Sequence, residues 1–303
     1  MKKILAVILI LGVLVGCSTT NENTDNKTYQ VLVPKGAPAL AVVNAMTDER
    51  EDAYTLVDGT DIITVELAKE NSEYDVIIAP INIGAKLIQS GQSSYKLASI
   101  LTWGNLYLVG TTESELTEPI AAFGELAVPG LVLEHIMKQS GMENEVTYYP
   151  SVSEAQVALL SGKSTLALLA EPSATATISK AKENGIELSI KADIQSMWEE
   201  ISDTYGYPQA AIFIKESVYL EDTKALETYL NHLSTSTTAE IDLLTSSIET
   251  IGPQELGVPS TALAVNTYSR QNIRYVDARE VQTEIVEFLS IFHIDVTDTL
   301  YLK

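Results

Sequence analysis

The chain is poor in the residues that build covalent or metal-held scaffolds. Its 303 residues include one cysteine, Cys17, and three histidines, His135, His232 and His293. A single thiol excludes an intrachain disulfide framework and a thiolate zinc cage. The histidines stand far apart, without a carboxylate or a second histidine at ligand spacing. We therefore expect no metal site and no cofactor.

Basic residues are also scarce. Lysine and arginine total 19 against 41 aspartates and glutamates, which gives a formal net charge of −22. This charge argues against a nucleic-acid partner, because such proteins need basic surfaces. It is typical of a well-solvated surface. The hydrophobic fraction of 46% is enough for a large core, and the length suits one large or two medium domains.

The apolar run at the start of the chain is too short to span a membrane. Residues 4–15 hold about a dozen residues, whereas a spanning helix needs about 20. The run follows two lysines and ends at Gly16-Cys17, as in an export signal. This end resembles the bacterial lipobox, in which the cysteine thiol receives a diacylglycerol. We expect residues 1–17 to be a signal peptide and lipobox, with Cys17 anchoring the protein to the membrane on its extracytoplasmic side.

Residues 18–28 follow this signal and contain no apolar side chain. Such a segment cannot bury enough surface to fold, so we expect a flexible tether. From residue 29 onward, short apolar runs alternate with helical patterns. This alternation predicts an α/β protein with mostly parallel sheets flanked by helices.

One pattern occurs twice along the chain: a helix, a glycine, a buried apolar strand and then a proline. The first copy ends at Ala79-Pro80 and the second at Ala170-Glu171-Pro172. In the second copy, Ser151 and Glu154 form a capping box at the helix start. We interpret the repeat as two similar lobes. The predicted strands are 30–33, 54–57, 75–79, 126–128, 165–170 and 210–214, and the predicted helices or helical regions are 39–46, 61–70, 81–89, 131–140, 152–160, 220–244 and 276–292.

These elements predict a discontinuous first lobe. We assign residues 29–109 and 215–303 to lobe 1 and residues 110–214 to lobe 2. The chain would then cross between the lobes near Gly110 and again near Lys215. Pro129-Gly130 is expected to be the turn that follows the strand 126–128.

Several segments resemble solute-binding lipoproteins of ABC importers. They are 33–39 (VPKGAPA), 75–80 (DVIIAP), 102–105 (TWGN), 128–130 (VPG), 161–163 (SGK), 170–172 (AEP) and 272–278 (NIRYVDA). The group concerned serves nitrate, sulfonate, taurine and thiamine precursors and has the type II periplasmic-binding fold. The resemblance implies two lobes joined by two crossing strands. These lobes would close on a small solute and deliver it to an ABC permease, without catalysing a reaction.

Ligands of open α/β sheets bind at the carboxyl ends of strands, near free N–H groups of helix N-termini. This rule selects loops in both lobes. Each selected residue also has an ordinary alternative role, in a turn or at a helix start. The selected ligand-binding candidates are Lys35, Gly36, Ala37 and Asn82 in lobe 1 and Pro129, Gly130, Glu171 and Tyr207 in lobe 2.

The segment Trp103-Gly104-Asn105 adds two further candidates, Trp103 and Asn105. A tryptophan beside glycine in a polar crossing segment is well placed to stack on a ligand ring, or it is a core residue. Glu171 either accepts a hydrogen bond from the ligand or is a carboxylate favoured by the helix dipole.

All four arginines lie outside these loops, where Lys35 is the only cation. Because arginine usually holds dianions, we expect a neutral or mildly cationic heteroaromatic solute, stacked on Trp103 and accepted by Glu171. A sulfonate held at a helix N-terminus is the alternative. The loops contain no histidine or cysteine, so we expect a binding protein. The alternatives are an enzyme on the same fold, of the pyrimidine- or menaquinone-pathway type, and a sensing or adhesion lipoprotein.

Overall fold

The computed structural model describes residues 27–202, 204–238 and 240–303. Cys17 and most of the predicted tether lie outside the described residues. Within the described ranges, no helix has the length and apolar character needed to cross a membrane.

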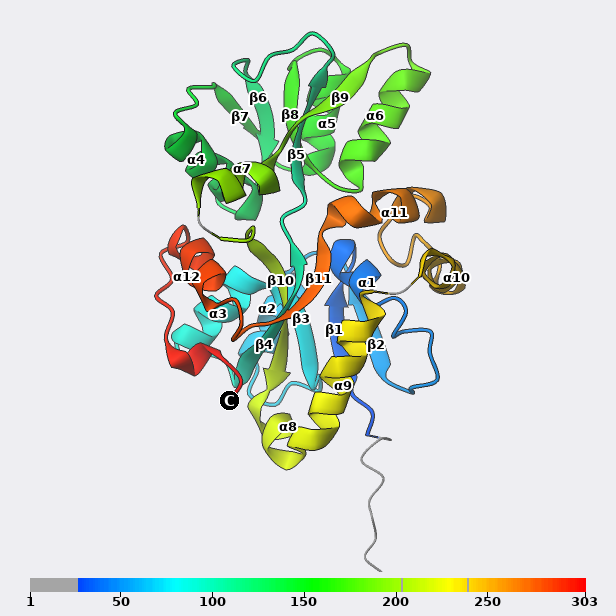
Figure 1. Ribbon diagram of the computed structural model, residues 1–303, viewed down its shortest axis with the longest axis vertical. Helices are drawn as coiled ribbons and strands as arrows, with labels where there is room; N and C mark the ends of the chain where they lie inside the picture. Colours follow the sequence, from blue (N-terminus) through cyan, green and yellow to red (C-terminus); the bar gives the residue numbers. More distant parts are fainter. Residues whose placement is uncertain (1–26, 203, 239) are drawn as a thin grey trace, which may run out of the picture.

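The described chain forms two α/β lobes, arranged one above the other along the long axis of the molecule (Figure 1). Lobe 1 contains a six-stranded sheet with the order β2-β1-β3-β10-β4-β11, and lobe 2 a five-stranded sheet with the order β7-β6-β8-β5-β9. In lobe 1, β10, which returns from lobe 2, lies between β3 and β4. In lobe 2, β5, which enters from lobe 1, lies between β8 and β9. The two-lobed α/β fold predicted from the repeated pattern is therefore confirmed.

Lobe 1 is built from the two ends of the described chain. Its strands are β1 (Gln30–Pro34), β2 (Ala53–Val57), β3 (Val76–Pro80), β4 (Tyr95–Trp103), β10 (Pro208–Lys215) and β11 (Ile273–Asp277). Its helices are α1 (Ala37–Ala41), α2 (Asp61–Ala68), α3 (Ile81–Gln89), α8 (Glu216–Glu221), α9 (Thr223–Ser236), α10 (Ile241–Ile251), α11 (Thr261–Thr267) and α12 (Gln282–Ser290), with the 3-10 helices η2 (Tyr268–Gln271) and η3 (Asp298–Leu300).

Lobe 2 is formed by the middle of the chain. Its strands are β5 (Leu106–Thr111), β6 (Ile120–Phe123), β7 (Val146–Tyr149), β8 (Leu166–Ala170) and β9 (Leu188–Asp193). Its helices are α4 (Val128–Ser140), α5 (Val152–Leu160), α6 (Ser173–Glu183) and α7 (Ile194–Ile201).

The central strands are apolar because helices cover both faces of their sheets. Residues 76–79 of β3 and residues 166–169 of β8 are fully buried. One face of the lobe 1 sheet packs against α2, α3 and α12, and the other packs against α1, α9 and α10. Both sheets are mixed, so the prediction of mostly parallel sheets is wrong. In lobe 1, β1 pairs in parallel with β2 and β3, whereas β10 is antiparallel to β3 and β4. In lobe 2, β6 pairs in parallel with β7 and β8, whereas β5 is antiparallel to β8 and β9.

The two crossings lie earlier in the chain than the sequence suggested. β5 belongs to the lobe 2 sheet and β10 to the lobe 1 sheet, so the chain crosses at Gly104-Asn105 and again between the end of α7 at Ile201 and the start of β10 at Pro208. The expected positions were Gly110 and Lys215. An apolar run such as residues 106–110 shows that a strand is present, but it does not show which sheet the strand joins.

Local signals at the helix starts had mixed outcomes. The Ser151 hydroxyl accepts a hydrogen bond from the Glu154 N–H at 3.3 Å, which confirms Ser151 as the cap of α5. The reciprocal bond of the predicted capping box, from the Ser151 N–H to the Glu154 carboxylate, is not among the hydrogen bonds of the described residues. The predicted strand at residues 126–128 is wrong, because these residues lead into α4. Pro129 stands in the first turn of α4, where its missing N–H leaves no helical bond unmade. The region 276–292 begins in β11 and only then becomes the helix α12.

Candidate functional site

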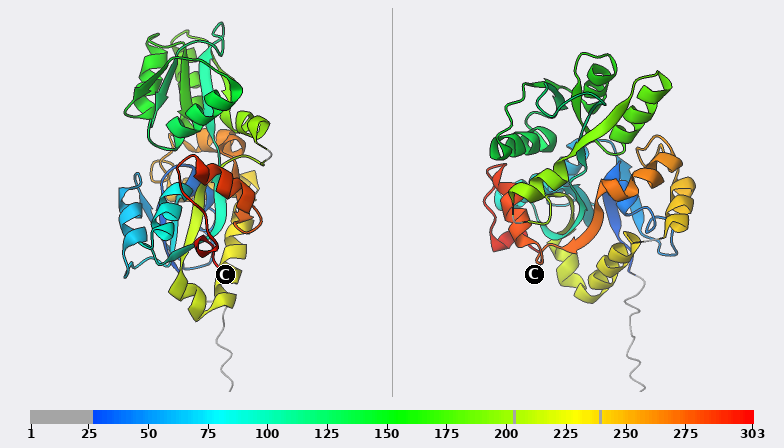
Figure 2. Two further views of the ribbon diagram at one scale, coloured as in Figure 1. Left: turned by 90° about the vertical axis from the view of Figure 1, so that its left-hand side faces the viewer. Right: turned by 45° about the horizontal axis from the view of Figure 1, so that its top comes forward.

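The two crossing segments contact each other directly. The Gly104 N–H donates to the Tyr207 carbonyl at 3.0 Å, and Trp103 pairs with Pro208 in the sheet. A Cβ at Gly104 would lie 2.1 Å from Cζ of Tyr207, so the ring leaves room only for glycine. The fully buried Tyr207 ring also stacks on Phe288 of α12, with ring centroids 5.6 Å apart. Figure 2 shows α12, in red, beside α7 at the junction of the lobes.

Asn105 and Glu171 are joined by backbone and side-chain bonds. The Glu171 N–H donates to the Asn105 carbonyl at 3.0 Å, and Asn105 Nδ2 donates to the Glu171 carbonyl at 3.3 Å. These bonds hold the first crossing against the end of β8. Asn105 Oδ1 is buried without a hydrogen-bond partner among the described residues. The structure therefore brings four sequence-derived candidates together, namely Trp103, Asn105, Glu171 and Tyr207.

The Glu171 carboxylate is occupied by other groups of the protein. Its side chain has no exposed surface, and Arg270 Nε of lobe 1 lies 2.8 Å from its Oε1. Thr175 donates to the same carboxylate from its N–H at 3.1 Å and from its hydroxyl at 2.7 Å. Arg270 also donates to the Thr175 hydroxyl at 2.8 Å. This ion pair links η2 of lobe 1 to the start of α6 in lobe 2.

Trp103 has a cationic neighbour from the same chain. It is 1% exposed, and its Nε1 donates to the Arg274 carbonyl at 3.1 Å. The Arg274 guanidinium carbon lies 4.3 Å from the Trp103 ring centroid and 4.6 Å from that of Tyr205. Burial lowers the pKa of this guanidinium from its usual value, although arginine remains charged in proteins. The cation that we expected the ligand to place against Trp103 is thus a side chain of the protein.

A pocket of about 280 Å³ opens beside these residues, between the two lobes. Lobe 2 contributes Gln195 and Glu199 of α7, and the second crossing contributes Tyr205. Lobe 1 contributes Trp103, at the end of β4, and residues of η2 and β11. The lining residues from lobe 1 are Trp103, Ser269, Asn272, Ile273 and Arg274. We call this the interlobe pocket.

The remaining candidates lie apart from this cluster. The Gly36 N–H donates to the Leu256 carbonyl at 2.8 Å, and Gly36 has a φ of 97°. This backbone conformation by itself accounts for a glycine at this position, with no need for a nearby ligand. Lys35 Nζ lies 3.4 Å from Asp58, and Ala37 begins α1.

Asn82 lies in the first turn of α3, with a buried Oδ1 that has no described partner. The Gly130 N–H donates to the Gly124 carbonyl at 3.0 Å, and Pro129 precedes it at the start of α4. Within the described ranges, no hydrogen bond or ion pair joins these loop residues to the residues around Trp103.

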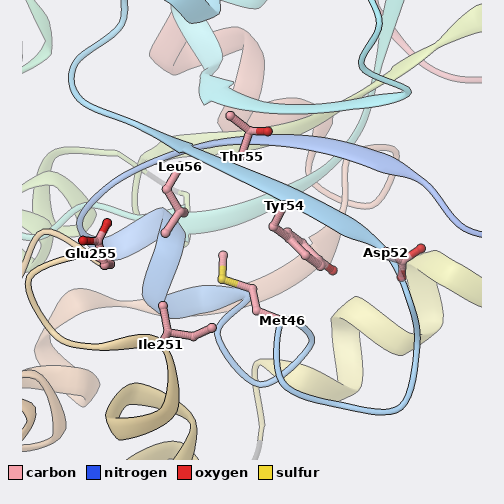
Figure 3. A pocket seen from close by; sticks show the side chains of 7 residues that line it. All are labelled: Met46, Asp52, Tyr54, Thr55, Leu56, Ile251 and Glu255. Carbon is pink, nitrogen blue, oxygen red and sulfur yellow. The ribbon is translucent and has the colours of Figure 1, made fainter.

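A larger pocket, of about 530 Å³, lies beside the edge strand β2 (Figure 3). It is lined only by lobe 1 residues, including Met46, Tyr54, Leu56 and Ile251. A ligand there would touch one lobe and would not bridge the two. Among the described residues, no group of three or more histidines, cysteines, aspartates and glutamates is arranged to hold a metal ion.

The sequence analysis placed all four arginines outside the binding loops, but Arg270 and Arg274 lie at the junction of the lobes. It also missed Gln195 and Tyr205. One signal was present: Arg274 lies in the segment 272–278 that carried part of the family resemblance. The antiparallel pairing of β11 with β4 places this segment beside Trp103, and such a pairing between distant segments leaves no local sequence signal.

Comparisons with known proteins support the fold at low sequence identity. No protein-family model and no curated protein matches the chain. Among solved structures, an ABC transporter protein from Parabacteroides distasonis is 20% identical with a TM-score of 0.77, covering 91% of this chain and 99% of that one.

The periplasmic aliphatic sulphonate-binding protein of Escherichia coli is 12% identical with a TM-score of 0.67, covering 88% of this chain and 92% of its own. The periplasmic nitrate-binding protein of Synechocystis is 10% identical with a TM-score of 0.58, covering 87% and 80%. The chain thus has the two-lobed α/β fold of these ABC-transporter periplasmic binding proteins.

Proposed function

We propose that this protein is an extracytoplasmic, lipid-anchored receptor that captures a small solute between its lobes and delivers it to an ABC permease. The observation that carries the proposal is the interlobe pocket, which is lined from both lobes and by Tyr205 of the second crossing. A solute that contacts both lobes favours the closed arrangement by its difference in affinity for the two states. Structural neighbours with sulphonate-binding and nitrate-binding functions support this reading.

The pocket also changes the expected ligand. A heteroaromatic cation would need Trp103 and Glu171, but Arg274 packs against the first and Arg270 pairs with the second. Arg274, which lines the interlobe pocket, instead favours a solute with an anionic group. A sulfonate, the earlier alternative, belongs to this class.

A thermal-shift screen against a library of small anions, zwitterions and neutral solutes tests the proposal. A ligand at 100 times its Kd adds about 2.7 kcal/mol to the folded state. We expect at least one such solute, and we expect deletion of the gene to abolish high-affinity uptake of the same compound. Unchanged uptake of a tightly bound solute would contradict the receptor role, and chemical conversion of the solute by the purified protein would support the enzyme alternative.

A further inference from the structure

The interlobe pocket carries opposite charges on its two sides. Arg274 belongs to β11, in the lobe 1 sheet. Glu199 belongs to α7, which packs on β5, β9 and α4 of lobe 2. Both residues line the pocket, and no ion pair in the described part of the chain joins them. A space between separated opposite charges suits a molecule that carries both charges itself.

The Arg274 guanidinium is held in place and still has unused donors. It packs against the rings of Trp103 and Tyr205, at 4.3 and 4.6 Å, which fixes its plane. Its Nη2 makes one long bond of 3.4 Å to the Tyr205 carbonyl. Its Nε is buried with no hydrogen-bond partner among the described residues. Because Nε is buried, a ligand would meet this guanidinium at its Nη groups, and a guanidinium held in place in this way is suited to a carboxylate or a sulfonate.

The lobe 2 side offers an acceptor surface for a positive group. Glu199 is exposed, and the only hydrogen bond to its carboxylate in the described chain is a long one, 3.5 Å from Gln195 Nε2. Gln195 itself is fixed, because its Oε1 accepts from the Tyr207 N–H at 3.4 Å. The pocket volume of about 280 Å³ is at the low end for ligand sites and suits a molecule of a few heavy atoms.

We propose that the interlobe pocket binds a small zwitterion, with its anionic group on Arg274 and its ammonium group toward Glu199. This inference rests on the proposed solute-receptor function and names the class of solute. Each charged end of the ligand contacts a different lobe. Binding of the intact zwitterion, but not of either half alone, then joins β11 to α7 across the crossings.

Calorimetry on the full-length protein in detergent tests the proposal with four probes. β-Alanine and taurine carry an ammonium with a carboxylate or a sulfonate, and they show which anion the pocket prefers. Propionate lacks the ammonium and ethylamine lacks the anion. We expect at least one zwitterion to bind, and each half-molecule to bind roughly tenfold or more weakly, as expected for loss of a charge-assisted bond.

Matched variants then assign the two ends. Glu199→Gln should weaken the zwitterion by roughly tenfold while leaving the affinity for propionate unchanged. Arg274→Gln should weaken both. The controls are Glu200→Gln, next to Glu199 on α7 but outside the pocket lining, and Arg279→Gln, whose partner Asp298 is on the surface. Because Arg274 also packs on Trp103, thermal melting must show that its variant folds, and Glu199→Gln provides the independent test.

The proposal is overturned if neither zwitterion binds at millimolar concentration, if propionate binds as tightly as β-alanine, or if Glu200→Gln weakens binding as much as Glu199→Gln. A solute found in the wider screen whose affinity is insensitive to both Glu199 and Arg274 also overturns it. That last result leaves the receptor function standing, so the two failures are distinguishable.

Discussion

Arg270 Nε of lobe 1 lies 2.8 Å from Glu171 Oε1 of lobe 2, and the glutamate side chain is completely buried. The pair links two segments that are 99 residues apart in the chain. The Arg270 side chain is 38% exposed, so its removal leaves the buried Glu171 carboxylate without its counter-charge, which costs more than the pair itself contributes. This contact therefore makes the relative position of the lobes sensitive to one arginine.

We predict that Arg270→Ala lowers the free energy of unfolding by about 2 to 3 kcal/mol. The effect should be smaller than for a fully buried pair because Arg270 is partly exposed and Thr175 still donates twice to the carboxylate. Chemical denaturation measures the change. Asp298→Asn, which breaks the exposed pair with Arg279, is the control and should cost less than about 1 kcal/mol. Equal effects in the two variants would show that Glu171 does not depend on Arg270.

A second prediction concerns the contact between the crossings. Gly104→Ala places a methyl group 2.1 Å from the Tyr207 ring and 2.4 Å from Gln195 Oε1. Overpacking of this kind costs roughly 1 to 3 kcal/mol. We also expect weaker solute binding, because Gln195 lines the interlobe pocket. Gly59→Ala meets no neighbouring atom and tests only its positive φ, so it should lower stability by about 1 kcal/mol without affecting binding.

Stability should fall in mild acid because of His135. Burial, and secondarily the charge of Lys138, lowers the pKa of this histidine, whose ring centroid lies 5.0 Å from that of Trp198. As the pH falls through the ordinary histidine value of about 6.5, the unfolded chain takes up the proton before the folded chain does. The free energy of unfolding therefore decreases as the pH falls through about 6.5, until the pH reaches the lower pKa of the folded histidine.

Denaturation curves at a series of pH values check this prediction. His135→Gln should flatten the decrease between pH 8 and pH 5, roughly the window set by histidine. At pH 8 the histidine is neutral in both the folded and the unfolded chain, so the difference in unfolding free energy between variant and parent at this pH reports only the lost packing, roughly free of any charge effect. A variant with the same slope as the parent protein would rule out His135 as the source.

We predict that anchoring to the membrane depends on Cys17. Cys17→Ala should release the protein from membranes, or leave it unprocessed, without changing the stability of the folded lobes. Detergent partitioning and mass measurement of the mature chain check both results. A variant that is still processed and still enters the detergent phase would contradict lipid attachment at this residue.

Much of the fold could be predicted from local patterns. Apolar runs located β1, β3 and β8, the predicted bounds of the helix at 81–89 are those of α3, and the cap at Ser151 was confirmed. These patterns depend only on residues close in sequence, so they can be recognised without knowledge of tertiary contacts. The crossings were misplaced because sheet membership depends on pairing between distant strands. The segment 126–128 was mistaken for a strand because an apolar residue beside Pro-Gly also occurs at a helix start.

The site was predicted only in part. Trp103, Asn105, Glu171 and Tyr207 are adjacent in the structure, whereas the candidates selected by the same rule at other strand ends lie apart from them. Their roles as ligand contacts remain a proposal. The interpretation of Trp103 and Glu171 as free binding groups failed to foresee Arg274 and Arg270, which come from residues more than 90 positions away. Whether a buried aromatic ring or carboxylate is free depends on such distant partners, and a local pattern does not contain them.

The strand orders of the two sheets have a consequence for how the protein forms. All five strands of the lobe 2 sheet lie between residues 106 and 193 without interruption. In lobe 1, β10 separates β3 from β4, and β10 begins only at Pro208. As the chain is synthesised from the N-terminus onward, the second lobe can therefore complete its sheet before the first lobe does. The first lobe must keep a gap beside the apolar strand β3 until the middle of the protein has been made.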